Sequence, residues 1–196
     1  MELTGAHARG ATLLEPDDIE GLIPGHVRTQ AELNEWEEAN ILQARAWLAR
    51  IRVRKSPFDY LFALRLHKQM FGRTWRWAGQ IRQSETNIGV DPRRIAQLFP
   101  QVLANAETQL SQNPADIDKI AARLHHRLVV IHAFQNGNGR HARLLVDVLL
   151  SENGHRAFAW GSGNLTAEGD VRARYLYALR AADVGDFSSL FAFVRS

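Results

Sequence analysis

A histidine followed by a glycine- and asparagine-rich turn and two arginines is the part of this sequence best suited to chemistry. His132 ends the apolar segment 129–131, and the turn after it leads into a helix predicted from Arg140 to Leu150. Backbone N–H groups of such a turn and the positive end of the next helix form an anion site. Arg140 and Arg143 project from one helix face and can grip phosphate oxygens in a planar fork. This spacing indicates a bound phosphate beside a titratable base.

The same residues also have an ordinary structural interpretation. Asn-Gly is a common turn signal between helices, and Arg143 with Asp147 at i, i+4 is typical of a surface ion pair. A histidine at the end of a helix is stabilised by the helix dipole. Spacing alone therefore leaves both interpretations open.

The apolar pattern predicts the helices that must position these residues. Thr29 and Glu32 form a capping box that opens a helix running to about residue 51. Residues 74–91 instead combine aromatic and β-branched side chains with glycines, which predicts a small β-hairpin. We expect a mainly α fold, a helical bundle with that hairpin, after an irregular N-terminal segment 1–28. Further helices are predicted at 56–72, 92–111, 114–131, 140–151, 167–184 and 187–194.

Composition narrows the function classes. A chain of 196 residues suits one domain with a real core. It has no cysteine, no long apolar run and no basic-then-apolar start, so we expect a cytoplasmic protein with no membrane partner. The net charge is +3 and the pI about 9.7. The arginines of the chain are scattered along the sequence and form no basic block, so we do not expect nucleic acid as a partner.

The run from His132 to Arg143 resembles the signature of the Fic (Fic/Doc) family. The family pattern is His, any residue, Phe, any residue, an acid, Gly-Asn-Gly-Arg, two residues, Arg. This chain matches each fixed position except the acid, where it has Asn136. The resemblance extends to both sides of this run. The family's segment that leads into its flap is similar to residues 66–71, 75–79 and 82–89, and its closing helices are similar to residues 178–193. The resemblance implies a Fic domain over residues 29–196.

The resemblance also implies an activity, a protein adenylyltransferase (AMPylation) that uses ATP and Mg²⁺. His132 would take a proton from a Ser, Thr or Tyr hydroxyl of a target protein, whose oxygen attacks the α-phosphorus so that pyrophosphate leaves. Arg140 and Arg143 would hold the β- and γ-phosphates, and Phe134 would mainly anchor the loop. The expected nucleotide-binding residues are Phe134, Gly137, Asn138, Gly139, Arg140 and Arg143.

The sequence offers two candidate metal sites, one at Asn136 and one at His125 and His126. The family's acid coordinates Mg²⁺, whereas Asn136 offers only an uncharged oxygen to a hard cation, so we expect a weak metal site there. His125 and His126 lie on the same helical side as His132, but no cluster of acids completes a ligand set, so we do not expect a metal at that place.

The resemblance implies that this hairpin is a flap that docks the target protein by strand pairing. The alternative is an ordinary hairpin that only covers the core. We expect Trp75 and Trp77 to pack rather than to bind ligand. The expected flap residues are Ser84, Glu85, Thr86, Asn87 and Ile88.

Many family members are inhibited by a helix with Ser or Thr, three residues, Glu, then Gly or Asn, whose glutamate pairs with the second arginine of the signature. Glu20-Gly21 is the nearest match here, although Pro16 stands where Ser or Thr is expected. Glu20 is thus a candidate inhibitory residue for Arg143. The alternatives are that Glu20 is a solvated acid and that a small antitoxin chain supplies the glutamate to a toxin.

Three other functions compete with AMP transfer. A Doc-type phosphotransferase would move the γ-phosphate, but Gly139 stands where that branch carries Lys. Asn136 leaves open a weakly active Fic fold that serves as a protein-binding module. A DNA-binding role has the least support, because no basic recognition helix stands out.

Overall fold

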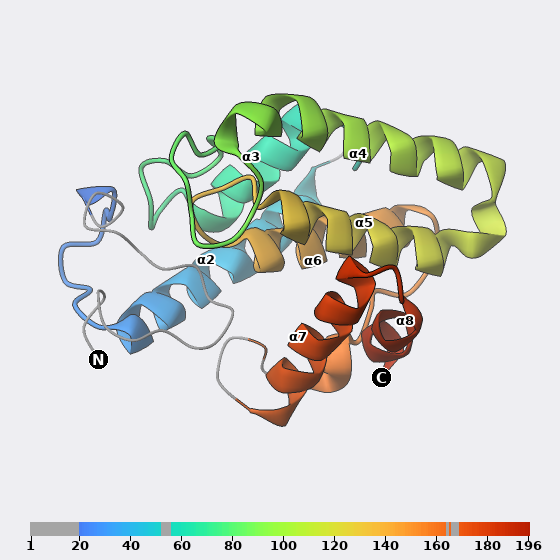
Figure 1. Ribbon diagram of the computed structural model, residues 1–196. Coiled ribbons are helices and arrows are strands. Elements are labelled where there is room, and N and C mark those ends of the chain that lie inside the picture. The colour runs from blue at the N-terminus through green and yellow to red at the C-terminus, as the bar shows by residue number, and fades with distance from the viewer. Residues whose placement is uncertain (1–19, 52–55, 164, 166–168) are drawn as a thin grey trace.

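The computed structural model describes residues 20–51, 56–163, 165 and 169–196 (Figure 1). The predicted mainly helical fold is confirmed, and the labels below follow the figure. The described helices are α2 (Gln30–Arg50), α3 (Tyr60–Phe71), α4 (Pro92–Gln112), α5 (Ile117–Ile131), α6 (Asn138–Glu152), α7 (Asp170–Asp183) and α8 (Ser188–Arg195), with 3-10 turns η1 (Pro114–Asp116) and η2 (Trp160–Ser162).

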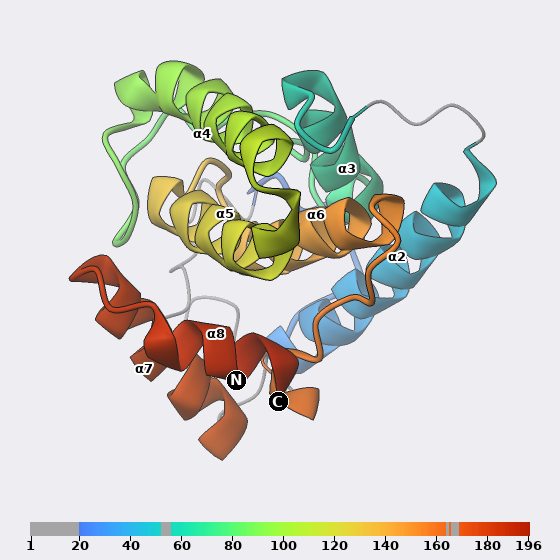
Figure 2. The same ribbon diagram turned by 90° about the vertical axis from the view of Figure 1, so that its right-hand side faces the viewer.

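Helix α6 lies in the middle of this bundle. It packs against α5 and α3, while α4 covers the far side of α5 and the α7–α8 pair closes the opposite side (Figures 1 and 2). Leu145, Val146 and Leu149 of α6 are all fully buried. A helix that is apolar on nearly every side must be enclosed by other helices. Its N-terminal turn, which carries the signature arginines, is therefore fixed by the core.

Local sequence signals set several helix ends as expected. The main-chain N–H of Glu32 donates to Thr29 Oγ1 (3.3 Å), and the Glu32 carboxylate accepts from the N–H of Thr29 (3.0 Å), which completes the predicted capping box. At the C-terminus of α6, Asn153 is the C-cap and Gly154 adopts a left-handed backbone (φ 76°). The predicted start of a helix at residue 167 lies outside the described residues, as do residues 1–19 of the segment expected to be irregular.

The prediction of a β-hairpin over residues 74–91 is wrong. This stretch is a series of turns and bends, and the β-contact it makes is one isolated bridge between Trp75 and Leu22. The cause is the buried Arg82, whose guanidinium donates to the carbonyls of His132 (2.7 Å), Ser84 (2.8 Å) and Val90. The arginine side chain satisfies carbonyls that a ladder would otherwise pair, so the loop closes without strands.

Trp75 and Trp77 pack as expected. Their rings stack with centroids 4.9 Å apart, and Trp75 is 1% exposed. In the described parts of the chain, no helix has the length and apolar character that crossing a bilayer requires.

Buried histidines join the helices through neutral rings. His67 Nδ1 accepts from the N–H of Gly79 (3.0 Å), so its proton is on Nε2, which donates to the carbonyl of Asn136 (3.1 Å). His141 bonds to the carbonyl of Ala63 (2.9 Å). Burial lowers the pKa of His67 well below its ordinary range and that of His141 to about 4. Both rings are therefore uncharged at neutral pH.

These shifts predict that acid destabilises the fold. A histidine whose pKa is near 6.5 unfolded and about 4 folded contributes stability that is complete above pH 6.5 and is lost as pH falls towards 4. We expect the free energy of unfolding, measured in urea at pH 7 and pH 5, to fall by about 2 kcal/mol for His141 alone. His141→Gln should reduce this dependence, and His155→Gln, at an exposed site, should not. An equal free energy of unfolding at pH 7 and pH 5 would contradict the inference that the buried histidine rings are neutral.

Candidate active site

His132 sits at the C-terminus of α5 in a strained backbone conformation. Its φ and ψ of 52° and 58° are left-handed, and its N–H still closes the helix by donating to the carbonyl of Leu128 (3.2 Å). Such a conformation costs a non-glycine residue about 1–2 kcal/mol. The bond from Arg82 Nε to the carbonyl of His132 holds it in place. The left-handed conformation reverses the chain direction directly after His132, and the turn begins there.

The environment of His132 keeps its imidazole neutral. The residue is only 4% exposed. Burial first, and then the charge of Arg82, lower its pKa to about 4, against the smaller raising effect of a hydrogen bond to the main chain of Val129. A general base must be unprotonated to accept a proton. His132 meets that condition throughout the neutral range.

The predicted flap residues lie in the loop that covers His132. Gly89 has φ 113°, and a Cβ there would lie 2.6 Å from the His132 Cβ and 2.8 Å from Arg82 Nη2. The loop is tied to the signature turn because Gln135 Nε2 donates to Ser84 Oγ (3.1 Å). Its tip is exposed, with Ile88 38% accessible. The structure thus brings the expected docking segment to the base as a loop, without a strand edge.

The turn before α6 leaves an uncapped helix N-terminus. Gly137 is the N-cap, with φ 78°, and a Cβ there would collide with the Phe71 ring at 2.6 Å. Only glycine fits this close approach. Among the described residues, no side chain caps α6. Unpaired N–H groups at a helix N-terminus are suited to an anion, and the phosphate-binding role of this turn stays a prediction.

Two residues predicted to bind the nucleotide hold the turn together with their side chains. Asn138 Oδ1 accepts from the N–H of Phe134 (2.8 Å), and its Nδ2 donates to the carbonyl of the same residue (2.6 Å). Phe134 is 1% exposed and stacks on His67 with ring centroids 3.7 Å apart. Phe134 is therefore the core anchor that the sequence suggested, and the nucleotide contacts of both residues stay a prediction.

The residues of this turn do not fit a resident Mg²⁺ ion. The Asn136 Oδ1 accepts from the N–H of Gly137 (2.6 Å), and a carboxamide brings no negative charge. Within the described ranges, no three His, Asp or Glu side chains cluster as metal ligands. His125 and His126 bond to the Tyr175 hydroxyl (2.9 Å) and the Asp183 carboxylate (2.8 Å).

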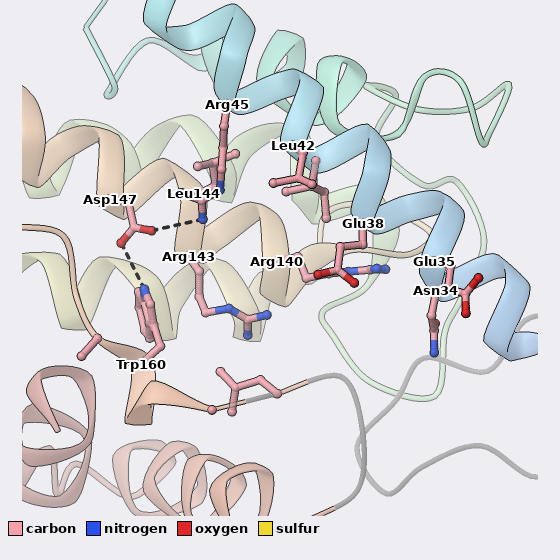
Figure 3. Close-up of a pocket in the computed structure, with 14 residues that line it drawn as sticks. Asn34, Glu35, Glu38, Leu42, Arg45, Arg140, Arg143, Leu144, Asp147 and Trp160 are labelled. Atoms are coloured by element: carbon pink, nitrogen blue, oxygen red, sulfur yellow. Dashed lines mark hydrogen bonds and ion pairs between the residues drawn. The ribbon is translucent and has the colours of Figure 1, made fainter.

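The two signature arginines share a cavity but have different partners. Both line a cavity of about 640 Å³ between α2, α6 and η2, into which they extend from α6 (Figure 3). Arg140 pairs with Glu37 (2.7 Å). Arg143 is hydrogen-bonded to the Tyr175 hydroxyl, and burial lowers its pKa. It does not form the expected surface pair, because Asp147 is buried against Trp160 Nε1 (3.0 Å).

Sequence reasoning missed Glu37, although a signal was present. The buried stripe of α2 is Leu33, Glu37, Asn40, Ala44 and Leu48. A carboxylate at a core position of an otherwise regular stripe needs a buried partner, and that requirement points to a cation on a neighbouring element.

The candidate inhibitory residue does not reach the arginines in this structure. Glu20 is exposed, and its main-chain carbonyl accepts from Arg76 Nη1 (2.9 Å). The ion pairs of the described residues include none between Glu20 and Arg143. Pro16 lies outside the described residues, so the inhibitory role of Glu20 stays a prediction.

Comparison with known proteins finds a family match for part of this chain. Residues 57–150 match the model of the Fic/DOC family. Over 138 residues the chain is 28% identical to protein adenylyltransferase fic-1 of Caenorhabditis elegans, a match that covers 67% of this chain and 25% of that protein. The chain thus spans about a quarter of that curated relative's length.

Solved structures share the fold. The N-terminal FIC domain of the Bep8 protein from Bartonella sp. 1-1C aligns with a TM-score of 0.68 at 15% identity, covering 88% of this chain and 89% of that one. The BepC protein of Bartonella tribocorum, solved with bound AMPPNP, aligns with a TM-score of 0.65 at 17% identity, covering 96% and 93%. At these identities the likeness establishes the fold alone.

The close approach at Gly89 predicts how the loop sets the environment of His132. Gly89→Ala should push the loop away, hydrate the imidazole and raise the His132 pKa from about 4 towards 6.5. An NMR titration of the ring protons measures this. Gly25→Ala is the matched control, because a Cβ there meets nothing within 4 Å. An unchanged His132 titration in the Gly89 variant would mean that the loop does not set this pKa.

Proposed function

We propose that this chain, whose residues 57–150 match the model of the Fic/DOC family, transfers AMP from ATP to a hydroxyl group of a target protein. The observation that carries the proposal is the neutral, buried His132 at the start of the turn that leads to the N-terminus of α6, the helix that carries Arg140 and Arg143. A base beside an anion site is the arrangement that phosphoryl-centre chemistry requires. The C. elegans relative named an adenylyltransferase and the AMPPNP in the BepC structure support ATP as the substrate.

Each part of the site has a task in this scheme. The N–H groups at the start of α6, with Arg140 and Arg143, bind the phosphates and offset their charge. The target segment lies along the loop 84–88 and directs a Ser, Thr or Tyr hydroxyl at His132. The imidazole takes the hydroxyl proton, the oxygen attacks the α-phosphorus, and the bond to the β-phosphate oxygen breaks, so pyrophosphate leaves with its electron pair.

Any Mg²⁺ is carried in by the nucleotide, because the uncharged Asn136 carboxamide, which already accepts from the N–H of Gly137, is a weak ligand for a hard cation. No step above depends on an ion held by this turn. The proposed restraint is an acid presented to Arg143 by Glu20 or by a small antitoxin chain, since the described ion pairs give Arg143 no carboxylate.

Labelled ATP tests the reaction. With cell lysate as the source of targets, label from the α-phosphate of ATP should reach protein and label from the γ-phosphate should not. His132→Ala should lower transfer by about 10²–10⁴-fold, because the lost group acts on the hydroxyl proton. His155→Ala, at an exposed histidine, is the control. Transfer of γ-label would indicate a kinase, and transfer of neither label would favour a binding module.

The pKa of His132 fixes the acid side of the pH profile. With a pKa of about 4, the ring stays almost wholly neutral at pH 5.5, whereas an ordinary histidine would be about nine-tenths protonated there. We expect kcat/KM to change less than about twofold between pH 7 and pH 5.5, provided circular dichroism shows a folded protein at both. A tenfold decrease in folded protein would show that the base titrates near 6.5.

A further inference from the structure

Glu37 is a buried carboxylate with two fixed partners. It lies on α2 and is 1% exposed. Its Oε2 contacts Arg140 Nη1 at 2.7 Å, and its Oε1 accepts from Trp75 Nε1 at 2.7 Å. Because Trp75 is itself buried in the core, both carboxylate oxygens are held in place.

Arg140 is held from a second direction as well. Its guanidinium carbon lies 5.0 Å from the centre of the Phe71 ring, a cation–π distance, and its side chain is 19% exposed. The guanidinium is therefore anchored between Glu37 and Phe71 while the residue lines the cavity. An arginine has five N–H donors, so a bond from Nη1 to Glu37 leaves other donors for a phosphate oxygen.

Arg143 differs in its charge balance. Its partner is the uncharged Tyr175 hydroxyl, and its guanidinium lies 5.8 Å from the centre of that ring. Across the described residues, no carboxylate lies within ion-pair distance of Arg143. Of the two signature arginines, Arg140 is thus paired with a carboxylate and Arg143, among the described residues, is not. The third arginine that lines the cavity, Arg45, lies 3.8 Å from the Asp147 carboxylate.

We propose that Glu37 is a positioning residue that fixes the guanidinium of Arg140 and cancels its charge, so that Arg143 supplies most of the charge that attracts the nucleotide. In this division Arg140 contributes the placement of its donors more than its charge. The inference rests on the proposed function, because it assigns roles to the two arginines of the same site.

The pair is expected to stay closed when a phosphate binds. Opening it would leave a carboxylate buried without its cation, which is strongly unfavourable. The Trp75 bond also prevents Glu37 from following Arg140 outward. The opposing possibility is a lock, in which Glu37 must release Arg140 before the nucleotide can bind productively.

Equilibrium binding tests the charge assignment without reference to transfer. By calorimetry with ATP, Arg143→Gln should weaken binding by about ten- to a hundredfold. The double variant Glu37→Gln with Arg140→Gln, which removes the ion pair without changing the net charge, should weaken it by only a few-fold. Glu37→Gln alone, which leaves the charge of Arg140 unbalanced, should bind ATP more tightly than the wild type. Adenosine, which has no phosphate, should bind all variants alike. Equal losses from Arg143→Gln and from the double variant would overturn the proposal.

Transfer kinetics test the positioning role. Glu37→Gln should lower kcat by about ten- to a hundredfold while KM for ATP does not rise, because misplaced donors act on the reacting geometry. The double variant Glu37→Gln with Arg140→Gln should be no slower than Arg140→Gln alone, since the two residues act as a unit. Losses that multiply would indicate a general structural role and overturn the proposal, and faster transfer by Glu37→Gln would establish the lock instead.

Controls separate these outcomes from misfolding. Glu107→Gln makes the same change on the exposed face of α4 and should leave kcat unchanged. If Glu37→Gln does not fold, Trp75→Phe removes the N–H donor to Glu37 together with part of the buried indole ring, and it should lower kcat in the same direction by a smaller factor. If the wild type transfers neither label, the proposed function fails, while the binding comparison still decides the role of Glu37.

Discussion

The turn between α5 and α6 is buried, so each of its polar groups must find a hydrogen-bond partner inside the protein. That constraint organises the whole site. Asn138 satisfies both main-chain groups of Phe134, His67 satisfies the carbonyl of Asn136, and Arg82 satisfies the carbonyl of His132. Three side chains from three separate segments thus hold one turn. The rigidity of the turn comes from these bonds, because its glycines supply none of their own.

The same burial sets the electrostatics. An enclosed imidazole loses its proton, and an enclosed carboxylate needs a cation, so His132 is neutral and Glu37 is paired. Among the described residues, Arg140 is paired with Glu37, whereas Arg143 has no carboxylate within ion-pair distance, and both arginines line the same cavity.

The loop over His132 shows how one buried cation can replace a regular structure. Arg82 gathers the carbonyls of Ser84 and Val90 around its guanidinium and also donates to the carbonyl of His132. Because the same side chain serves both segments, the position of the loop and the position of His132 depend on each other. A target segment that moves this loop would also change the surroundings of the base.

The helices, the capping box at Thr29, the order of base candidate, turn and arginines, and the resemblance to the Fic family could all be predicted from the sequence. These are local properties, since they depend on residues a few positions apart. The sequence predicted a hairpin at 74–91 because the local pattern contains no sign that Arg82 would contact a residue 50 positions away. Likewise, the partner of Asn136 lies 69 positions away and that of Glu37 lies 38 away at Trp75. The low pKa of His132 and the different partners of the two arginines could not be predicted from the sequence, because burial and ion pairing arise when distant segments pack together.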